Sequence, residues 1–283
     1  MAGVASERAA CCLRVALLAT AALTLGCGAK TYQERLEESR KYFAYIEKLD
    51  ANLAKPPFKG GAIEELRVPL QFQPVAAPPP VKNEKGEVVP PDVDPRQPNY
   101  LLIELPGLIG TWESAFDITS SEGREKRKGY IYVLSNAALP LTTPPEKFAD
   151  FSRNVVELLA GALRVPTPDP TQAVTESYPR APAYTVPNKF EVFRFGADQA
   201  NISDAPHTVE VYIYRQGELQ FVLVVVLPVG IDSSQKISER IQLMLERLRV
   251  STRRQPAGVP KAAPTPGPAS TTTPETPKPA TGF

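Results

Sequence analysis

The chain of 283 residues contains a single histidine, His207, and this scarcity excludes several kinds of catalytic site. A Ser-His-Asp triad would have to use His207, and no Gly-x-Ser-x-Gly motif accompanies it. Gly60-Gly61 lacks the lysine and the serine or threonine of a phosphate-binding loop. We therefore nominate no catalytic residue and expect no enzyme activity, and we expect the lone histidine to be a solvated residue at the start of a strand.

The chain also has almost no net charge, because 32 lysines and arginines stand against 31 aspartates and glutamates. Nucleic-acid-binding domains carry a basic surface that neutralises phosphates. The charge balance indicates no such surface, so we expect no nucleic-acid partner.

No hydrophobic run is long enough to cross a membrane. The apolar run near the N-terminus covers the eleven residues 15–25, none of them charged, with Arg8 and Arg14 before it. A helix of that length spans about 16 Å, roughly half of a hydrocarbon core. A basic segment followed by a short apolar run is typical of a secretory signal peptide.

The end of this run resembles the lipobox of bacterial lipoproteins. Gly26 directly precedes Cys27, and Leu23 and Leu25 lie upstream, although Thr24 stands where the usual pattern has leucine. The resemblance implies that residues 1–26 are removed and that Cys27 is acylated as the first residue of the mature chain. The alternative is a plain secretory signal that is cut nearby, with Cys27 incidental.

The cysteine count agrees with a lipid anchor. Cys11 and Cys12 lie in the segment that would be removed, which leaves Cys27 as the one mature cysteine and allows no internal disulfide. A zinc or copper site of histidines and cysteines cannot be assembled either, and we expect no metal and no cofactor. An unpaired reactive thiol is the alternative use of Cys27.

The anchor implies an exported protein that faces the periplasm or the cell surface, with the membrane as one partner and a protein or another envelope component as a second. Gly28 follows the cysteine. Where an acidic residue at that position retains lipoproteins in the inner membrane, its absence favours the outer membrane.

Three segments are distinguished after the signal. Residues 27–254 form one domain, with a proline-rich insertion at 74–99 and an irregular, proline-studded loop at 165–187. Residues 255–283 are rich in proline, threonine and alanine and are expected to be disordered. This tail is either inert or acts as a spacer, a glycosylated stalk or a contact with the cell wall.

Hydrophobic periodicity predicts the elements of the domain. An amphipathic helix is expected over residues 30–54, to pack on its own domain or to serve as a stalk or as a helix that binds a partner. Thr143 and Asp232 are expected to cap two further helices. Strands are expected at residues 67–73, 100–105, 111–118, 130–134, 188–195, 207–215 and 219–227, with a charged turn at 120–128. The short connections predict an α+β domain with helices packed on a mostly antiparallel sheet.

The order of these elements is similar to that of PsbP-like domains and of mycobacterial LpqN-type lipoproteins. The residues that carry the resemblance are the strand at 219–227 and the helix capped by Asp232 that follows it. The resemblance implies an accessory or binding module.

Five aromatic residues at strand spacing could line a ligand groove or pack in the core: Trp112, Tyr130, Tyr132, Tyr212 and Tyr214. Trp112, Tyr212 and Tyr214 are the candidate groove, for a sugar or an apolar ligand. The function favoured by the sequence is that of a lipid-anchored envelope protein with a binding domain. The alternatives are a glycan hydrolase that uses two carboxylates and a structural spacer that reaches the cell wall through its tail.

Overall fold

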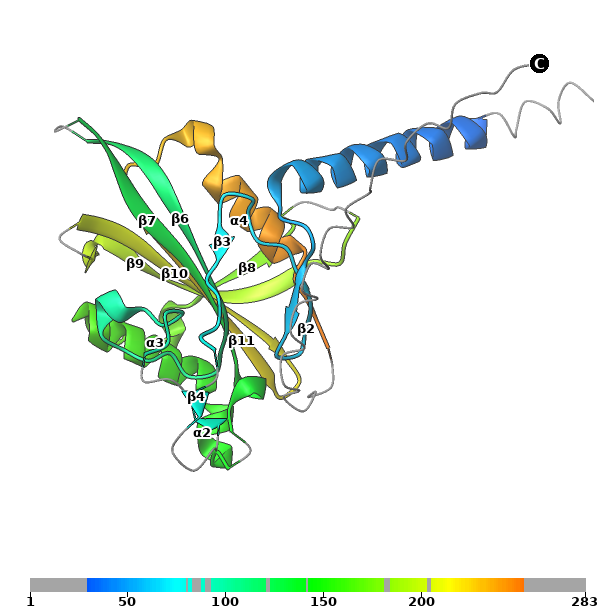
Figure 1. Cartoon of the computed structure of the whole chain (residues 1–283). Helices are drawn as coiled ribbons and strands as arrows, with labels where there is room; N and C mark the ends of the chain where they lie inside the picture. Colours follow the sequence, from blue (N-terminus) through cyan, green and yellow to red (C-terminus); the bar gives the residue numbers. More distant parts are fainter. Residues whose placement is uncertain are drawn as a thin grey trace, which may run out of the picture.

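A computed structural model describes residues 30–251, except 80, 83–87, 90–92, 121–122, 141, 181–183 and 203–204 (Figure 1). The predicted signal peptide, Cys27 and the predicted tail at 255–283 lie outside the described residues.

The domain is built on a seven-stranded sheet in which every neighbouring pair is antiparallel. The strands, in spatial order, are β3 (Gln73–Pro74), β6 (Leu108–Ser120), β7 (Gly123–Ser135), β11 (Leu219–Pro228), β10 (Ala205–Gln216), β9 (Asn188–Ile202) and β8 (Val174–Tyr178).

The central strand β11 is buried on both faces along its whole length. Leu223 and Val225 belong to the core on one side of the sheet, and Val224 and Val226 belong to the core on the other. Strands buried on both faces read as continuous apolar runs, and this prediction for residues 219–227 is confirmed. A turn was predicted at Gln216-Gly217, but it lies one residue later, at Gly217-Glu218, because Gln216 still pairs with Leu219; Gly217 has φ 60°.

Helices cover both faces of the sheet (Figure 1). On one face, the N-terminal helix (residues 30–52) meets α4 (Ile237–Glu246), which adds Ile241, Met244 and Leu245 to the core. On the other face, α2 (Pro145–Ala149) leads into α3 (Phe151–Leu163). The predicted α+β class, with helices on an antiparallel sheet, is confirmed. Four 3-10 turns complete the helical elements: η1 (Asn99–Leu101), η2 (Asn136–Ala138), η3 (Pro170–Gln172) and η4 (Ser233–Gln235).

Two small sheets accompany the large one. In the first, β2 (Ile63–Leu66) lies between β1 (Phe58–Gly60) and β12 (Arg249–Val250). It therefore joins the chain after the N-terminal helix to the chain after α4. In the second, β4 (Val81–Lys82) pairs with β5 (Val88–Val89) inside the predicted proline-rich insertion.

Three strand-region predictions were wrong. Residues 67–72 form no strand, and only Gln73 of the predicted segment belongs to one, β3. Pro69 makes one isolated bridge to Leu53, and Leu70 is exposed. Residues 100–105 begin inside η1 and turn at Leu102, which has φ 54° and ends η1. Tyr100, within η1, stacks on Tyr130 of β7. The segment predicted as a charged turn is largely strand, since β7 begins at Gly123 and places Lys126 opposite Asp117 on β6. Opposite charges across neighbouring strands stabilise such pairing.

Both predicted helix caps also differ from the structure. The cap of α2 is Pro144 and not Thr143, and the chain bends at Asp150 before α3. Asp232 caps the 3-10 turn η4 through the amide of Ser234, so α4 starts only after Lys236. The loop predicted as irregular at 165–187 contains the edge strand β8.

Candidate functional site

The N-terminal helix extends away from the domain along most of its length (Figure 1, blue). Residues 30–44 are all exposed, and burial begins only in the last turns, where Leu49 and Leu53 enter the core. The 23 helical residues span about 35 Å at 1.5 Å per residue. The helix is therefore attached at its C-terminal end and projects at its N-terminal end, so packing along its whole length is not observed.

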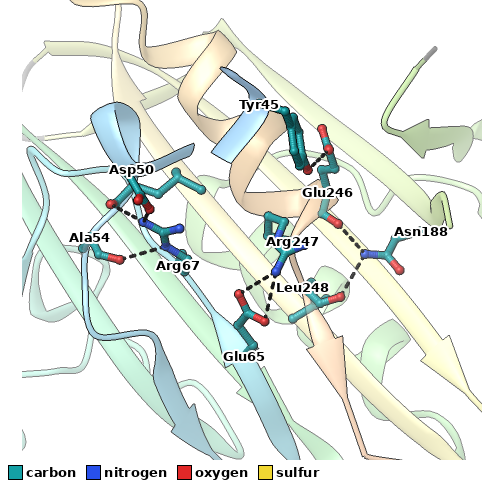
Figure 2. Close-up of polar contacts among 10 residues, drawn as sticks. Tyr45, Asp50, Ala54, Glu65, Arg67, Asn188, Glu246, Arg247 and Leu248 are labelled. Carbon is teal, nitrogen blue, oxygen red and sulfur yellow. Dashed lines mark hydrogen bonds and ion pairs between the residues drawn. The ribbon is translucent and has the colours of Figure 1, made fainter. Parts of the chain in front are cut away.

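A polar junction fixes this helix on the domain (Figure 2). The polar junction consists of seven side chains: Tyr45, Asp50, Glu65, Arg67, Asn188, Glu246 and Arg247. Its first contact is between the N-terminal helix and α4, where the Tyr45 hydroxyl donates a hydrogen bond to the Glu246 carboxylate. Glu246 is only 6% exposed, so Tyr45 supplies a donor to a carboxylate largely removed from water. Lys48 adds an ion pair to Glu239 of α4, at 2.7 Å.

The second contact of the polar junction closes the C-terminal end of the same helix. Arg67 is buried, and its guanidinium donates to the carbonyls of Leu53 at 3.0 Å and Ala54 at 3.1 Å. The same group pairs with Asp50 at 3.0 Å (Figure 2). Carbonyls at a helix C-terminus lack partners within the helix. Arg67 donates to such carbonyls, and these hydrogen bonds tie the helix to the segment that follows β2.

The third contact anchors the end of α4. The Asn188 amide donates to the carbonyls of Leu245 and Leu248, each at 3.0 Å, and Arg247 pairs with Glu65 of β2 at 3.1 Å (Figure 2). The N-terminal helix, β2, β9 and α4 are thereby held together by side chains that are far apart in the sequence.

The ionisation of Tyr45 gives a pH test of the polar junction. Burial of its hydroxyl, together with Glu246, raises the pKa of Tyr45 to about 12 from its ordinary 10.0. A raised tyrosine pKa means that the folded state favours the protonated form, so its stabilising contribution is complete below pH 10 and is lost as the pH rises toward 12. In urea unfolding above pH 10, we expect the wild type to lose stability faster than Tyr45→Phe.

The matched control for this test is Tyr32→Phe, because Tyr32 lies on the exposed part of the same helix. Its alkaline unfolding should follow the wild type. Identical pH profiles for the wild type and Tyr45→Phe would contradict the role given to the Tyr45–Glu246 contact.

His207 is not the solvated residue that was predicted. It is 5% exposed, and its Nδ1 lies 2.8 Å from the Ala205 carbonyl oxygen. A cavity of about 460 Å³ lies beside it, lined by Tyr100, Glu125, Lys126, Arg127, Lys128, Tyr130, Ile202, Ala205 and His207.

The lining of this cavity combines rings with cations. Tyr100 stacks on Tyr130 with ring centroids 4.9 Å apart, and the Tyr132 hydroxyl donates to the Tyr100 hydroxyl at 3.0 Å. Lys126, Lys128 and Tyr130 are every second residue of β7, so their side chains lie on the same face of the strand. An aromatic wall with lysines at its rim suits a small anionic ligand with a flat, apolar part.

A larger cavity of about 740 Å³ lies between α2 and the β10–β11 turn. It is lined by Pro140, Thr143, Pro145, Phe148, Ala149, Gln216, Gly217, Glu218, Leu219 and Gln220. Each of these two cavities carries one carboxylate on its lining, Glu125 in the smaller and Glu218 in the larger.

The candidate groove residues are placed in the core. Trp112 is buried, and its ring meets Phe58 edge to face at 5.0 Å. Tyr212 is buried against Tyr178 and Phe190, and Tyr214 is half-buried at 5.5 Å from the Phe190 ring. Trp112 and Tyr212 belong to one core cluster and Tyr214 packs against it, so the structure places these side chains in the packing of the core.

The polar junction and the cavity beside His207 were missed by sequence reasoning. The Tyr45–Glu246 pair spans 201 residues, and no local pattern marks either side chain. Within the described residues, no group of three or more His, Cys, Asp or Glu side chains could hold a metal ion, and no helix is long and apolar enough to cross a membrane.

In comparisons with protein-family models and with curated proteins, no match to this chain was found.

Proposed function

We propose that the chain is an exported envelope protein, anchored to a membrane by lipid on Cys27, whose α+β domain binds a partner or ligand without catalysis. One observation carries the proposal: the N-terminal helix projects from the domain and begins at Lys30, three residues after Cys27. An anchor at that point leaves both cavities of the domain open for binding.

The lipid and the polar junction have separate tasks in this proposal. One acyl chain binds a membrane only marginally, whereas two or more anchor a protein stably. The lipid therefore supplies the affinity for the membrane. The polar junction fixes the direction in which the helix leaves the domain, and with it the side of the domain that faces away from the membrane.

The cavities support binding over glycan hydrolysis. Glycosidases place two carboxyl groups about 5 Å apart when they retain configuration and about 6.5–9.5 Å apart when they invert it. Each cavity described above is lined by one carboxylate. The cavity beside His207, with its lysines and stacked tyrosines, is the part of the domain that we assign to a small anionic ligand.

The anchor is tested by Cys27→Ser in cells grown with labelled palmitate. We expect complete loss of the acyl label and accumulation of a precursor that keeps residues 1–26. In the wild type, the labelled protein should fractionate with membranes. Where an acidic residue after the cysteine retains lipoproteins in the inner membrane, Gly28 predicts that the label is found in the outer membrane.

The matched controls are Cys11→Ser and Cys12→Ser, which change cysteines in the segment to be removed. Both variants should keep the label and the mature size. A Cys27→Ser chain that still carries the label would overturn the proposal.

A further inference from the structure

The projecting part of the N-terminal helix carries an uncovered apolar stripe, formed by Tyr32, Leu36 and Phe43. At 3.6 residues per turn, these side chains fall within an arc of about 40°. They are 68%, 39% and 63% exposed, respectively. Among the described residues, nothing buries them, although the same helix continues directly into the core at Leu49.

Charges are distributed unevenly around this stripe. Arg35 and Arg40 lie on either side of it, about 60–80° from its centre at 100° per residue. Glu34, Glu37 and Glu38 all lie more than about 100° from its centre, on the opposite half of the helix. An apolar face bordered by arginines, with the acidic residues turned away, is typical of a helix that lies in a membrane interface.

Aromatic side chains continue the stripe to the body of the domain. The rings of Tyr42 and Phe43 meet at 5.9 Å, and Tyr42 meets Tyr184 of the domain at 5.3 Å. Tyr42 and Tyr184 are both exposed. Tyrosines gather at the headgroup level of membranes because one end of the ring system is apolar and the other is polar.

We propose that the apolar stripe lies in the headgroup region of an anionic membrane surface, which makes the N-terminal helix a second membrane contact beside the lipid. This inference rests on the proposed acylation of Cys27. Three extended residues reach at most about 11 Å, so an acylated Cys27 holds the first turn of the helix next to the bilayer. The helix then lies along the membrane, and the polar junction sets the tilt of the domain above it.

A second copy of the chain fits the stripe less well. Coiled coils need apolar positions sustained over about three to four heptads, and residues 30–44 provide about two. Ser39 also interrupts the stripe between Leu36 and Phe43. Within residues 30–44, the arginines at both borders have no acidic counterpart on the same face, and the next acidic residue on that face is Glu47, beyond the stripe. Anionic lipid headgroups would pair with both arginines.

The experiment places a tryptophan on each face of the helix. The native Trp112 is buried and gives a constant background. Leu36→Trp and Phe43→Trp probe the stripe, and Glu34→Trp and Glu37→Trp are matched controls on the opposite face. Each full chain is expressed with its own signal, purified as processed by the cell, and added to vesicles of phosphatidylglycerol and phosphatidylethanolamine that contain brominated lipid.

We expect quenching by the brominated lipid to be several-fold stronger at the stripe positions than at the control positions, and to weaken when Arg35→Glu and Arg40→Glu are added. Equal, weak quenching on both faces would overturn the inference in favour of a stalk standing in water. A blue-shifted, unquenched signal at Leu36→Trp, with cross-linking into dimers, would overturn it in favour of a second copy.

The acyl label is scored on the same preparations, so the two proposals fail separately. If the chain carries the acyl label but the tryptophans on the stripe are not quenched, this inference is wrong and the proposed anchor stands. An unlabelled chain with a quenched stripe removes the anchor and keeps the membrane contact.

Discussion

Replacing Phe221 with alanine is expected to lower the free energy of unfolding by about 3–5 kcal/mol. Phe221 is 0% exposed and lies on the central strand β11, opposite Ser135 of β7 and Tyr214 of β10. Removing its ring takes away buried apolar surface and leaves a cavity that the two flanking strands cannot close by moving. Urea unfolding followed by circular dichroism measures the loss.

The matched control is Phe43→Ala on the projecting helix. Because Phe43 is exposed, the change should leave the free energy of unfolding within about 0.5 kcal/mol of the wild type. Similar losses in the two variants would contradict the division of the chain into a buried sheet and a projecting helix.

Asn188→Asp is expected to produce the second-largest loss, about 3 kcal/mol or more, because a buried group then loses its partners and gains a charge. The Asn188 amide is buried and donates to the carbonyls of Leu245, Glu246 and Leu248 at 3.0, 3.4 and 3.0 Å. An aspartate has nearly the same shape, but it directs acceptor oxygens at three carbonyl oxygens. Thermal and urea unfolding would report the loss.

Two further variants separate shape from charge. Asn188→Ala removes the donors without adding a charge and should lose less, about 1–3 kcal/mol. Asn154→Asp makes the same chemical change on the exposed side of α3 and should be close to neutral. Equal stability of the Asn188→Asp and Asn154→Asp variants would show that the amide does not hold the end of α4.

The sequence by itself determined the elements whose pattern is strong and local. The continuous apolar run of β11, the alternation of β10 and the buried stripe of α4 were each predicted, because burial on one or two faces leaves a direct record in residue spacing. The proposed membrane anchor at Cys27 rests on the sequence alone, because its signal is a linear motif.

Contacts between distant parts of the chain were decided by the tertiary structure. Residues 123–128 look like a charged turn until β6 lies beside them and pairs Lys126 with Asp117. His207 looks solvated until β10 places it between β9 and β11, where it is buried beside a cavity. The polar junction joins Tyr45 to Glu246 across 201 residues.

Two amphipathic helices, α4 and the N-terminal helix, show the physical reason most clearly. Both carry an apolar stripe at helical spacing, yet Met244 of α4 is completely buried and Phe43 of the N-terminal helix is exposed. Spacing records which side of a helix is apolar. What lies against that side depends on where the rest of the chain folds, and no part of the described structure buries Tyr32, Leu36 or Phe43.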